Sequence, residues 1–133
     1  MATNPQKNSL NKLEKLKSRK VIEQLFVKPQ GYFYQHPIKI SWLVTELETK
    51  FPAQMAVVVS KRNFAKAIHR NYIKRVLRDA YRNNKHTLYE ELKKQNKQMA
   101  LVVSFTSKNF EQYAAIEKGT KACLDKIINE ISK

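Results

Sequence analysis

SKRNFAKAIHRNYIKRVLRDAYR, residues 60–82, places cations and apolar side chains on opposite sides of one predicted helix. At about 100° per residue, the apolar side is formed by Ile73, Val76, Leu77 and Ala80. The other side is an arc of roughly 140° that contains Arg70, Asn71, Lys74, Arg75, Arg78 and Arg82. This spacing predicts a helix over residues 67–82, with one side for the core and the other for a partner.

The charge of this region is one-sided. Residues 60–86 hold a single acid, Asp79, against nine cations, which gives a local charge of 9 − 1 = +8; the cations are Lys61, Arg62, Lys66, Arg70, Lys74, Arg75, Arg78, Arg82 and Lys85. Like charges four residues apart on a helix repel each other. A solvated face is the ordinary interpretation of a charged helix, but such a face normally interleaves both signs. The pattern therefore indicates an anionic partner.

The whole chain supports this interpretation. It has 133 residues with 26 basic and 11 acidic side chains, a net charge of +15, which favours a polyanion. A single cysteine, Cys123, rules out an internal disulfide, and we expect it to be buried. No apolar run is long enough for a signal peptide or a membrane span, so we expect no membrane association and a cytoplasmic location. We predict one domain over residues 16–133, preceded by a basic, flexible tail over residues 1–15; the helical spacing of Leu10, Leu13 and Leu16 leaves a weak helical turn there as the alternative.

Hydrophobic periodicity predicts the remaining elements. A short helix capped by Ser18 runs to Val27 and ends before Pro29 and Gly31. Strands are expected at 38–44, 55–59 and 99–105, and the last two have the continuous apolar character of buried strands. The helix of residues 67–82 weakens at Asn83 and resumes as a short turn near 88–92, and a final helix starts near residue 109 or 110. The predicted order is αββαβα, an α+β sandwich.

The chain shows no pattern typical of a catalytic centre. His36, His69 and His86 lack metal-ligand spacing, and no Ser, Cys or Lys lies in a nucleophile motif. With only two glycines there is no phosphate-binding loop, so a small-molecule nucleotide substrate is not expected. We expect no catalytic residue, no metal site and no cofactor in this protein. An extended nucleic acid, gripped by arginine forks and lysine charges, is the best-supported partner.

The motif itself resembles the protein subunits of bacterial ribonuclease P. That family has a strand ending in Ser-Lys-Lys or Lys-Arg, a linker that often contains Lys-Ala, and then Arg-Asn-Arg-Ile-Lys-Arg followed by Leu-Arg-Glu and an aromatic residue. The matching segments here are Ser60-Lys61-Arg62, Lys66-Ala67, Arg70-Asn71-Tyr72-Ile73-Lys74-Arg75 and Leu77-Arg78-Asp79-Ala80-Tyr81. A looser resemblance extends from Leu16 to Ile131.

The resemblance implies a ribosomal-protein-like fold in which the basic helix joins two parallel strands by a left-handed crossover. It also implies a function. The family's protein binds ribonuclease P RNA and helps it remove 5′ leaders from precursor tRNA, while the RNA, with Mg²⁺ bound to it, performs the hydrolysis. The expected partners are therefore ribonuclease P RNA and precursor tRNA.

The resemblance also suggests two sets of site residues. For the RNA subunit they are Lys61, Arg62, Lys66, Arg70, Asn71, Lys74, Arg75 and Arg78, and Arg82 extends the same arc. For the single-stranded leader, in a cleft between the first helix and the sheet, they are Phe26, Tyr32, Tyr34, Lys39, Ile40 and Trp42. For Phe26, Ile40 and Trp42 a position in the core is an equally good interpretation.

The sequence departs from the family pattern at two positions. Tyr72 stands where the family has the second arginine of Arg-Asn-Arg, and Ile22 stands where the cleft often has an aromatic residue. Tyr72 lies about 130° from the middle of the cationic arc, so the arc survives the exchange. A ribosomal or other architectural RNA-binding protein is the main alternative, and a DNA-binding protein that uses the helix in a major groove is a weaker one.

Overall fold

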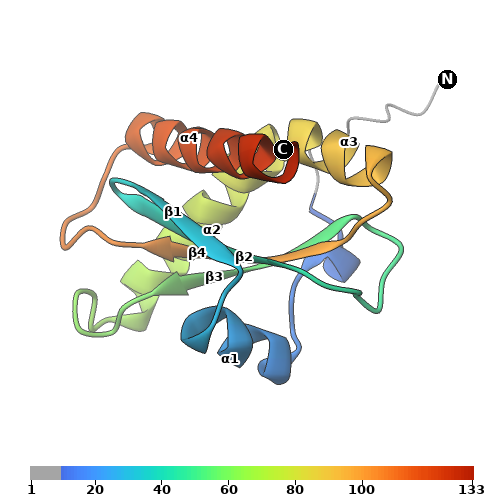
Figure 1. Cartoon of the computed structure of the whole chain (residues 1–133). Coiled ribbons are helices and arrows are strands. Elements are labelled where there is room, and N and C mark those ends of the chain that lie inside the picture. Colours follow the sequence, from blue (N-terminus) through green and yellow to red (C-terminus); the bar gives the residue numbers. More distant parts are fainter. Residues whose placement is uncertain (1–9) are drawn as a thin grey trace, which may run out of the picture.

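The computed structural model describes residues 10–133, which form one sheet with helices on both faces (Figure 1). The elements follow in the order η1 (Lys12–Glu14), α1 (Arg19–Val27), β1 (Gly31–Gln35), β2 (Ile38–Val44), β3 (Ala53–Val59), α2 (Ala67–Asn84), α3 (His86–Lys94), β4 (Met99–Phe105) and α4 (Tyr113–Ile131). Helices α2, α3 and α4 lie on one side of the sheet and α1 lies on the other. The predicted α+β class is confirmed.

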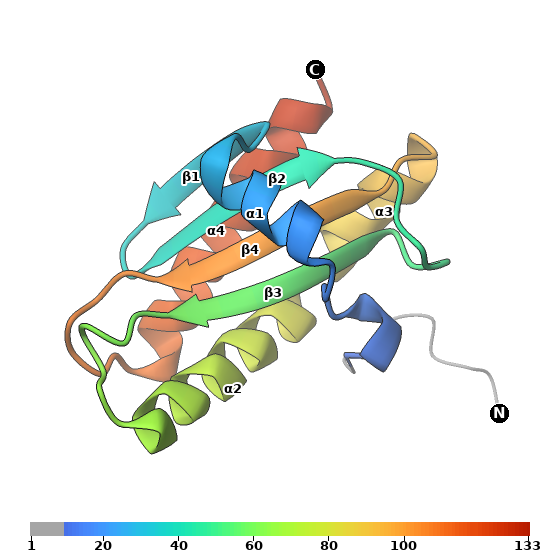
Figure 2. The same ribbon diagram turned by 90° about the horizontal axis from the view of Figure 1, so that it is seen from below.

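The sheet has four strands in the order β1-β2-β4-β3. β1 and β2 form an antiparallel hairpin, β2 and β4 are antiparallel, and β3 and β4 are parallel. Seen from the α1 side with β3 and β4 pointing upward, β4 lies to the right of β3 while α2 and α3 lie behind the sheet (Figure 2). The crossover is therefore left-handed, as expected, against the strong general preference for right-handed connections.

Each face of the sheet has its own hydrophobic core. On one face, alternate residues of β2 and β4 such as Ile40, Trp42 and Leu101 pack with the apolar sides of α2, α3 and α4. On the other face, Ala100 and Val102 pack with Leu16 and Leu25 beneath α1. Helix α1 begins after Ser18, whose hydroxyl accepts the backbone N–H of Val21, as the sequence predicts. Because α1 is short, it covers only part of its face.

Gly119 lies where α4 crosses the β1–β2 hairpin. A Cβ atom added at this position would lie 2.9 Å from the carbonyl oxygen of Gln35 and 3.1 Å from Cγ1 of Ile38. The residue that interrupts the helical pattern in the sequence is therefore the one that lets helix and hairpin approach closely. Cys123, one turn further along α4, is buried as predicted.

Residues 10–17 form a strap along the free edge of β3, and we call this segment the N-terminal strap. The backbone N–H of Leu16 donates to the carbonyl of Met55, Lys15 forms an isolated bridge with Met55, and Gln54 donates to the carbonyl of Leu13. The strap covers backbone groups that an edge strand would otherwise expose. Of the two alternatives predicted for residues 10–15, the structure shows the helical turn, at Lys12–Glu14, and residues 1–9 lie outside the described part of the chain.

A buried polar cluster anchors the strap to the helices. The carboxylate of Glu14 accepts hydrogen bonds from Lys85 Nζ at 2.6 Å and from the Tyr89 hydroxyl at 2.7 Å. The hydroxyl of Tyr81 lies 3.0 Å from that of Tyr89. Because Tyr89 donates its only hydroxyl proton to Glu14, Tyr81 must be the donor of this second hydrogen bond. The side chains of Glu14 and Lys85 are only 2% and 4% exposed. Burial also raises the pKa of both tyrosine hydroxyls above its ordinary value, so both stay protonated.

Two elements differ from the sequence prediction. The prediction missed β1, because Gly31–Gln35 is short and becomes a strand by pairing with β2. Residues 86–94 form the full helix α3 rather than a short turn, with Leu88 and Leu92 buried in the core. The predicted boundaries of β2 and β4 are confirmed, β3 and α2 are each two residues longer than predicted, and α4 starts at Tyr113 instead of residue 109 or 110.

Among residues 10–133, no helix combines the length and the apolar character that a membrane crossing requires.

Candidate nucleic-acid interface

The six residues of the predicted cationic arc, which we call the basic stripe, lie on α2 on the side away from its apolar positions. Ile73, Leu77 and Ala80 are buried on the core side of the helix. Every stripe residue is at least partly exposed, namely Arg70, Asn71, Lys74, Arg75, Arg78 and Arg82. The amphipathic helix, 18 residues long, thus presents a row of cations that is anchored from behind by the sheet.

The loop before α2 adds three more exposed cations, Lys61, Arg62 and Lys66, which we call the basic loop. Ser60 shapes it, because its carbonyl accepts from the N–H of Phe64 and its hydroxyl accepts from the N–H of Arg62. Arg70 then fastens the loop to the helix by donating to the carbonyls of Phe64 and Ala65 at 2.9 and 2.8 Å. Arg70 therefore has a structural role in addition to its place in the basic stripe.

The N-terminus of α2 adds to this positive surface. Lys66 precedes the helix without a side-chain hydrogen bond to the first turn, and the first turn contains no acid. The backbone N–H groups of the first turn and the positive end of the helix dipole therefore lie next to the basic loop, which directly precedes the helix. Such an arrangement favours phosphate groups.

Few of these cations are neutralised by the protein itself. On the basic stripe, Arg82 forms an ion pair with Asp79 at 3.0 Å. Within residues 10–133, none of the other cations of the basic stripe and the basic loop has an acidic partner within 4 Å. Lys85, which the sequence adds to the local charge of this region, is instead buried against Glu14 and does not contribute to the surface. Lys85 was not among the residues predicted for the interface, so the predicted set is unchanged, and within residues 10–133 Arg82 is its member with an acidic partner.

A second candidate surface lies on the sheet beneath α1, and we call it the cleft face. Strand pairing places Tyr34 opposite Lys39, Tyr32 opposite Ser41, and Lys39 opposite Ser104, so all five side chains share one face. The ammonium of Lys39 lies 4.5 Å from the centre of the Tyr32 ring. α1 leaves the arrowhead end of β4 uncovered (Figure 2). Both tyrosines are exposed, as is Phe26 on α1.

Two predicted leader contacts are wrong. Ile40 and Trp42 are 0% and 3% exposed and belong to the core on the opposite face of the sheet. They alternate with Lys39 and Ser41 along β2, so they point away from the cleft face. Gly31 makes room for the indole, because a Cβ atom there would lie 3.0 Å from the Trp42 ring. Conversely, sequence reasoning missed Ser41 and Ser104; the alternation along residues 38–44 could have found Ser41, but Ser104 requires the strand pairing.

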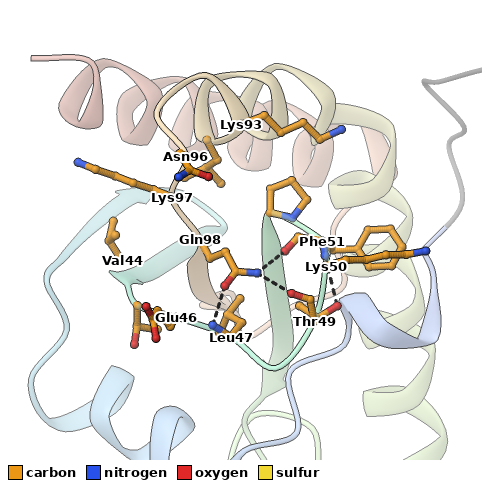
Figure 3. A pocket seen from close by; sticks show the side chains of 13 residues that line it. Val44, Glu46, Leu47, Thr49, Lys50, Phe51, Lys93, Asn96, Lys97 and Gln98 are labelled. Carbon is orange, nitrogen blue, oxygen red and sulfur yellow. Dashed lines mark hydrogen bonds between the residues drawn. The ribbon is translucent and has the colours of Figure 1, made fainter.

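A pocket of about 680 Å³ lies at the other end of the sheet, between the loop of residues 45–52 and the turn before β4 (Figure 3). Gln98 holds it together: its amide N donates to the carbonyls of Thr49 and Phe51, and its amide O accepts from the N–H of Leu47. Lys50, Lys93 and Lys97 line the pocket. The side-chain amide of Gln98 forms all of these hydrogen bonds with the backbone of the loop. Gln98 therefore fastens the loop to the start of β4.

The titratable groups of the described residues bear on two kinds of reactive site, a metal site and a reactive thiol. Within residues 10–133, no group of three or more His, Cys, Asp or Glu side chains is placed to hold a metal ion. Burial raises the pKa of the Cys123 thiol to about 11, which keeps it a thiol at neutral pH. His36 lies on the hairpin turn near Tyr34 and Glu111, with half of its side chain exposed.

Comparisons with a family model and with individual proteins both point to the same family. A family model described as Ribonuclease P matches residues 10–128. The ribonuclease P protein component of Porphyromonas gingivalis is 26% identical over 129 residues, which cover 97% of this chain and 93% of the relative. The ribonuclease P protein component of Chlorobium phaeobacteroides is 37% identical over 90 residues, covering 62% of this chain and 58% of the relative.

Proposed function

The chain belongs to the ribonuclease P protein family, and on this basis we propose how its two surfaces divide the work. Its role is that of the protein subunit of the endoribonuclease that matures the 5′ ends of tRNA, and ribonuclease P RNA is its partner. The family match favours this function over that of an architectural RNA-binding protein. The division of labour between the surfaces, the substrate contacts and the source of the metal ion are our proposals.

We propose that the basic stripe and the basic loop dock onto the RNA subunit. The observation that carries this proposal is that, within residues 10–133, Arg82 is the cation of the basic stripe and the basic loop that has an acidic partner, while the others line one side of a helix anchored to the sheet and the loop before it. Unpaired cations on a rigid element can each replace a counterion on an RNA phosphate, which is the main source of affinity for nucleic acids. Arg70 would hold the basic loop in shape while it contributes to the same surface.

We propose that the cleft face receives the single-stranded 5′ leader of precursor tRNA. Tyr32 and Tyr34 expose their rings, Lys39 supplies a cation beside them, and Ser41 and Ser104 supply hydroxyl groups. Bases stack on aromatic rings with little dependence on their identity, which suits leaders of many sequences. With Ile22 at the position where the family often has an aromatic residue, the stacking surface here would lie on β1 more than on α1.

We propose that the hydrolytic chemistry belongs to the RNA subunit and the Mg²⁺ bound to it. The described residues offer no ligand set for that ion. The protein's own residues would bind the RNA subunit, hold the leader and reduce the repulsion between two polyanions, all of which stabilise the complex without a protein nucleophile. Since precursor tRNA is the substrate in this proposal, we place its action in the cytoplasm, where bacterial tRNA is transcribed.

A stimulation assay tests the function. Purified protein is added to a bacterial ribonuclease P RNA, and the cleavage of precursor tRNA is followed at several Mg²⁺ concentrations. We expect the protein to lower the Mg²⁺ concentration at which cleavage is half-maximal, and to cleave nothing without the RNA. A protein that binds the RNA but leaves the Mg²⁺ requirement unchanged would favour the architectural alternative.

A further inference from the structure

An exposed aromatic cluster lies beside the basic stripe at the start of α2. His69 and Tyr72 on α2 meet Phe110 from the segment before α4, with ring centres 5.2 Å apart for His69–Phe110 and 6.3 Å apart for Tyr72–Phe110. We call these three residues the aromatic patch. Although the rings touch each other, Tyr72 and Phe110 remain 50% and 52% exposed. Single exposed aromatic residues are common, but exposed aromatic side chains that lie together often mark an interaction site.

The aromatic patch is supported from below and continuous with the basic stripe. Phe110 packs edge to face on the buried Phe64, with ring centres 5.3 Å apart, so the patch rests on the core. On the other side, the guanidinium of Arg75 lies 5.6 Å from the centre of the Tyr72 ring. Arg75 therefore belongs to the basic stripe and also borders the aromatic patch. A ligand that reaches from one to the other must combine phosphate with a flat, π-bonded surface.

We propose that the aromatic patch, centred on Tyr72 and Phe110, is a stacking site for an unpaired base of the ribonuclease P RNA whose neighbouring phosphate is held by Arg75. This inference rests on the proposed docking of the basic stripe and names a further contact in that interface. Tyr72 stands where the family motif has an arginine. This chain therefore has an aromatic ring at a position where the family has a group that can bind phosphate. A base can stack on a ring whatever its identity, and an adjacent arginine adds a cation–π contribution.

Charge separates an RNA base from the other occupants that an apolar patch can have. A second copy of this chain would bring another net charge of +15 against the basic stripe. At physiological salt, charges less than about 8 Å apart are only partly screened, and Arg75 lies 5.6 Å from the centre of the Tyr72 ring. An RNA base arrives with a phosphate of the opposite sign on either side. The surroundings of the patch therefore favour RNA over self-association.

The test measures the affinity for the RNA subunit over a series of salt concentrations. We expect Tyr72→Leu, which keeps the apolar character but removes the ring, to weaken binding about five- to 100-fold. The slope of log affinity against log salt should stay unchanged, because every cation that holds a phosphate is still present. Tyr72→Phe is the matched control and should bind within about twofold of the natural protein, since phenylalanine keeps the stacking surface.

Phe110→Leu should act in the same direction, but because Phe110 also packs on Phe64, the Tyr72 variants carry the decision. Circular dichroism melts confirm that each variant is folded. Natural affinity in Tyr72→Leu would overturn the inference, and so would a salt slope that flattens by about 1, which indicates that one phosphate is no longer held. Self-association of the RNA-free protein that disappears in Tyr72→Leu would also overturn it.

The inference and the proposed function can fail separately. If Lys74→Ala weakens binding and Tyr72→Leu does not, the docking surface stands and the stacking site falls. If the natural protein does not bind the RNA subunit at all, the proposed function falls with it.

Discussion

The basic stripe of α2 and the cluster around Glu14 both contain cationic side chains, but those of the stripe are at least partly exposed and that of the cluster is buried. Lys74 and its neighbours on the basic stripe lie partly in water, and within residues 10–133 Arg82 is the stripe residue that has an acidic partner. Lys85, directly after the same helix, is buried, paired with Glu14 and placed 5.2 Å from the centre of the Tyr89 ring. The buried cation is neutralised by a carboxylate of the protein itself. The cations that we propose for RNA binding are exposed to water instead. The total charge of a segment does not distinguish the two.

The largest effect is expected from removing Glu14. Glu14→Ala leaves the ammonium of Lys85 buried without a counter-charge, which typically costs about 3–5 kcal/mol. The free energy of unfolding, measured by urea denaturation, should fall by this amount. The double variant Glu14→Ala/Lys85→Met removes both charges and should recover part of the loss.

Lys74→Met is the matched control for this prediction, because it removes an open lysine of the same helical region and should leave the unfolding free energy within about 0.5 kcal/mol. A Glu14→Ala variant as stable as that control would show that the buried pair does not hold the strap.

The next effect concerns the open cations. Lys74→Ala/Arg75→Ala/Arg78→Ala should flatten the log–log dependence of RNA affinity on salt by roughly 2 to 3, at about 0.7–0.9 for each phosphate that the variant no longer holds. The unfolding free energy should hardly change, because Arg70, which fastens the loop, is kept. The matched control removes three exposed lysines of α4, Lys118→Ala/Lys121→Ala/Lys126→Ala. If both triple variants change the slope equally, the basic stripe acts only through net charge.

The cleft face should respond to salt in a different way from the basic stripe. Tyr32→Leu and Tyr34→Leu should each weaken the binding of leader-bearing precursor tRNA to the holoenzyme by about 1–3 kcal/mol, with little change in the salt slope. Binding of tRNA without a leader provides the control and should be unaffected. An equal loss for both substrates would place these tyrosines outside the leader path.

The smallest effect is expected at the ion pair on the basic stripe. Asp79→Asn removes the carboxylate that partners Arg82, a surface pair worth about 0–1 kcal/mol. The free energy of unfolding should therefore change by less than about 1 kcal/mol. RNA affinity should rise slightly, since one acid is removed from the docking surface. A clear loss of RNA affinity would mean that Asp79 orients Arg82 for its contact.

Helical and strand periodicity were sufficient to predict the basic stripe and the strands of residues 38–44 and 99–105, because these patterns are local. The same periodicity separates Lys39 from Ile40 and Trp42, which cannot lie on one face of a strand. Grouping all three in the cleft was the error, and it came from the family resemblance rather than from the residues. β1 escaped detection because its strand character depends on its pairing with β2.

The features that the sequence could not reveal join residues far apart along the chain. Glu14 meets partners 71 and 75 positions away, and Phe110 meets His69 and Tyr72 from another element. Local patterns carry no information on such pairs. For the same reason, a buried lysine such as Lys85 looked like one more surface cation until its partner was known.

The sequence separation within the Glu14 cluster bears on how the protein is made. The strap is synthesised before its partners, because Lys85 and Tyr89 follow only after the strands β1, β2 and β3. During translation the strap therefore cannot complete its buried polar cluster until Tyr89 of α3 has been synthesised. Until the strap is fixed in this way, the edge of β3 would lie open to other growing chains.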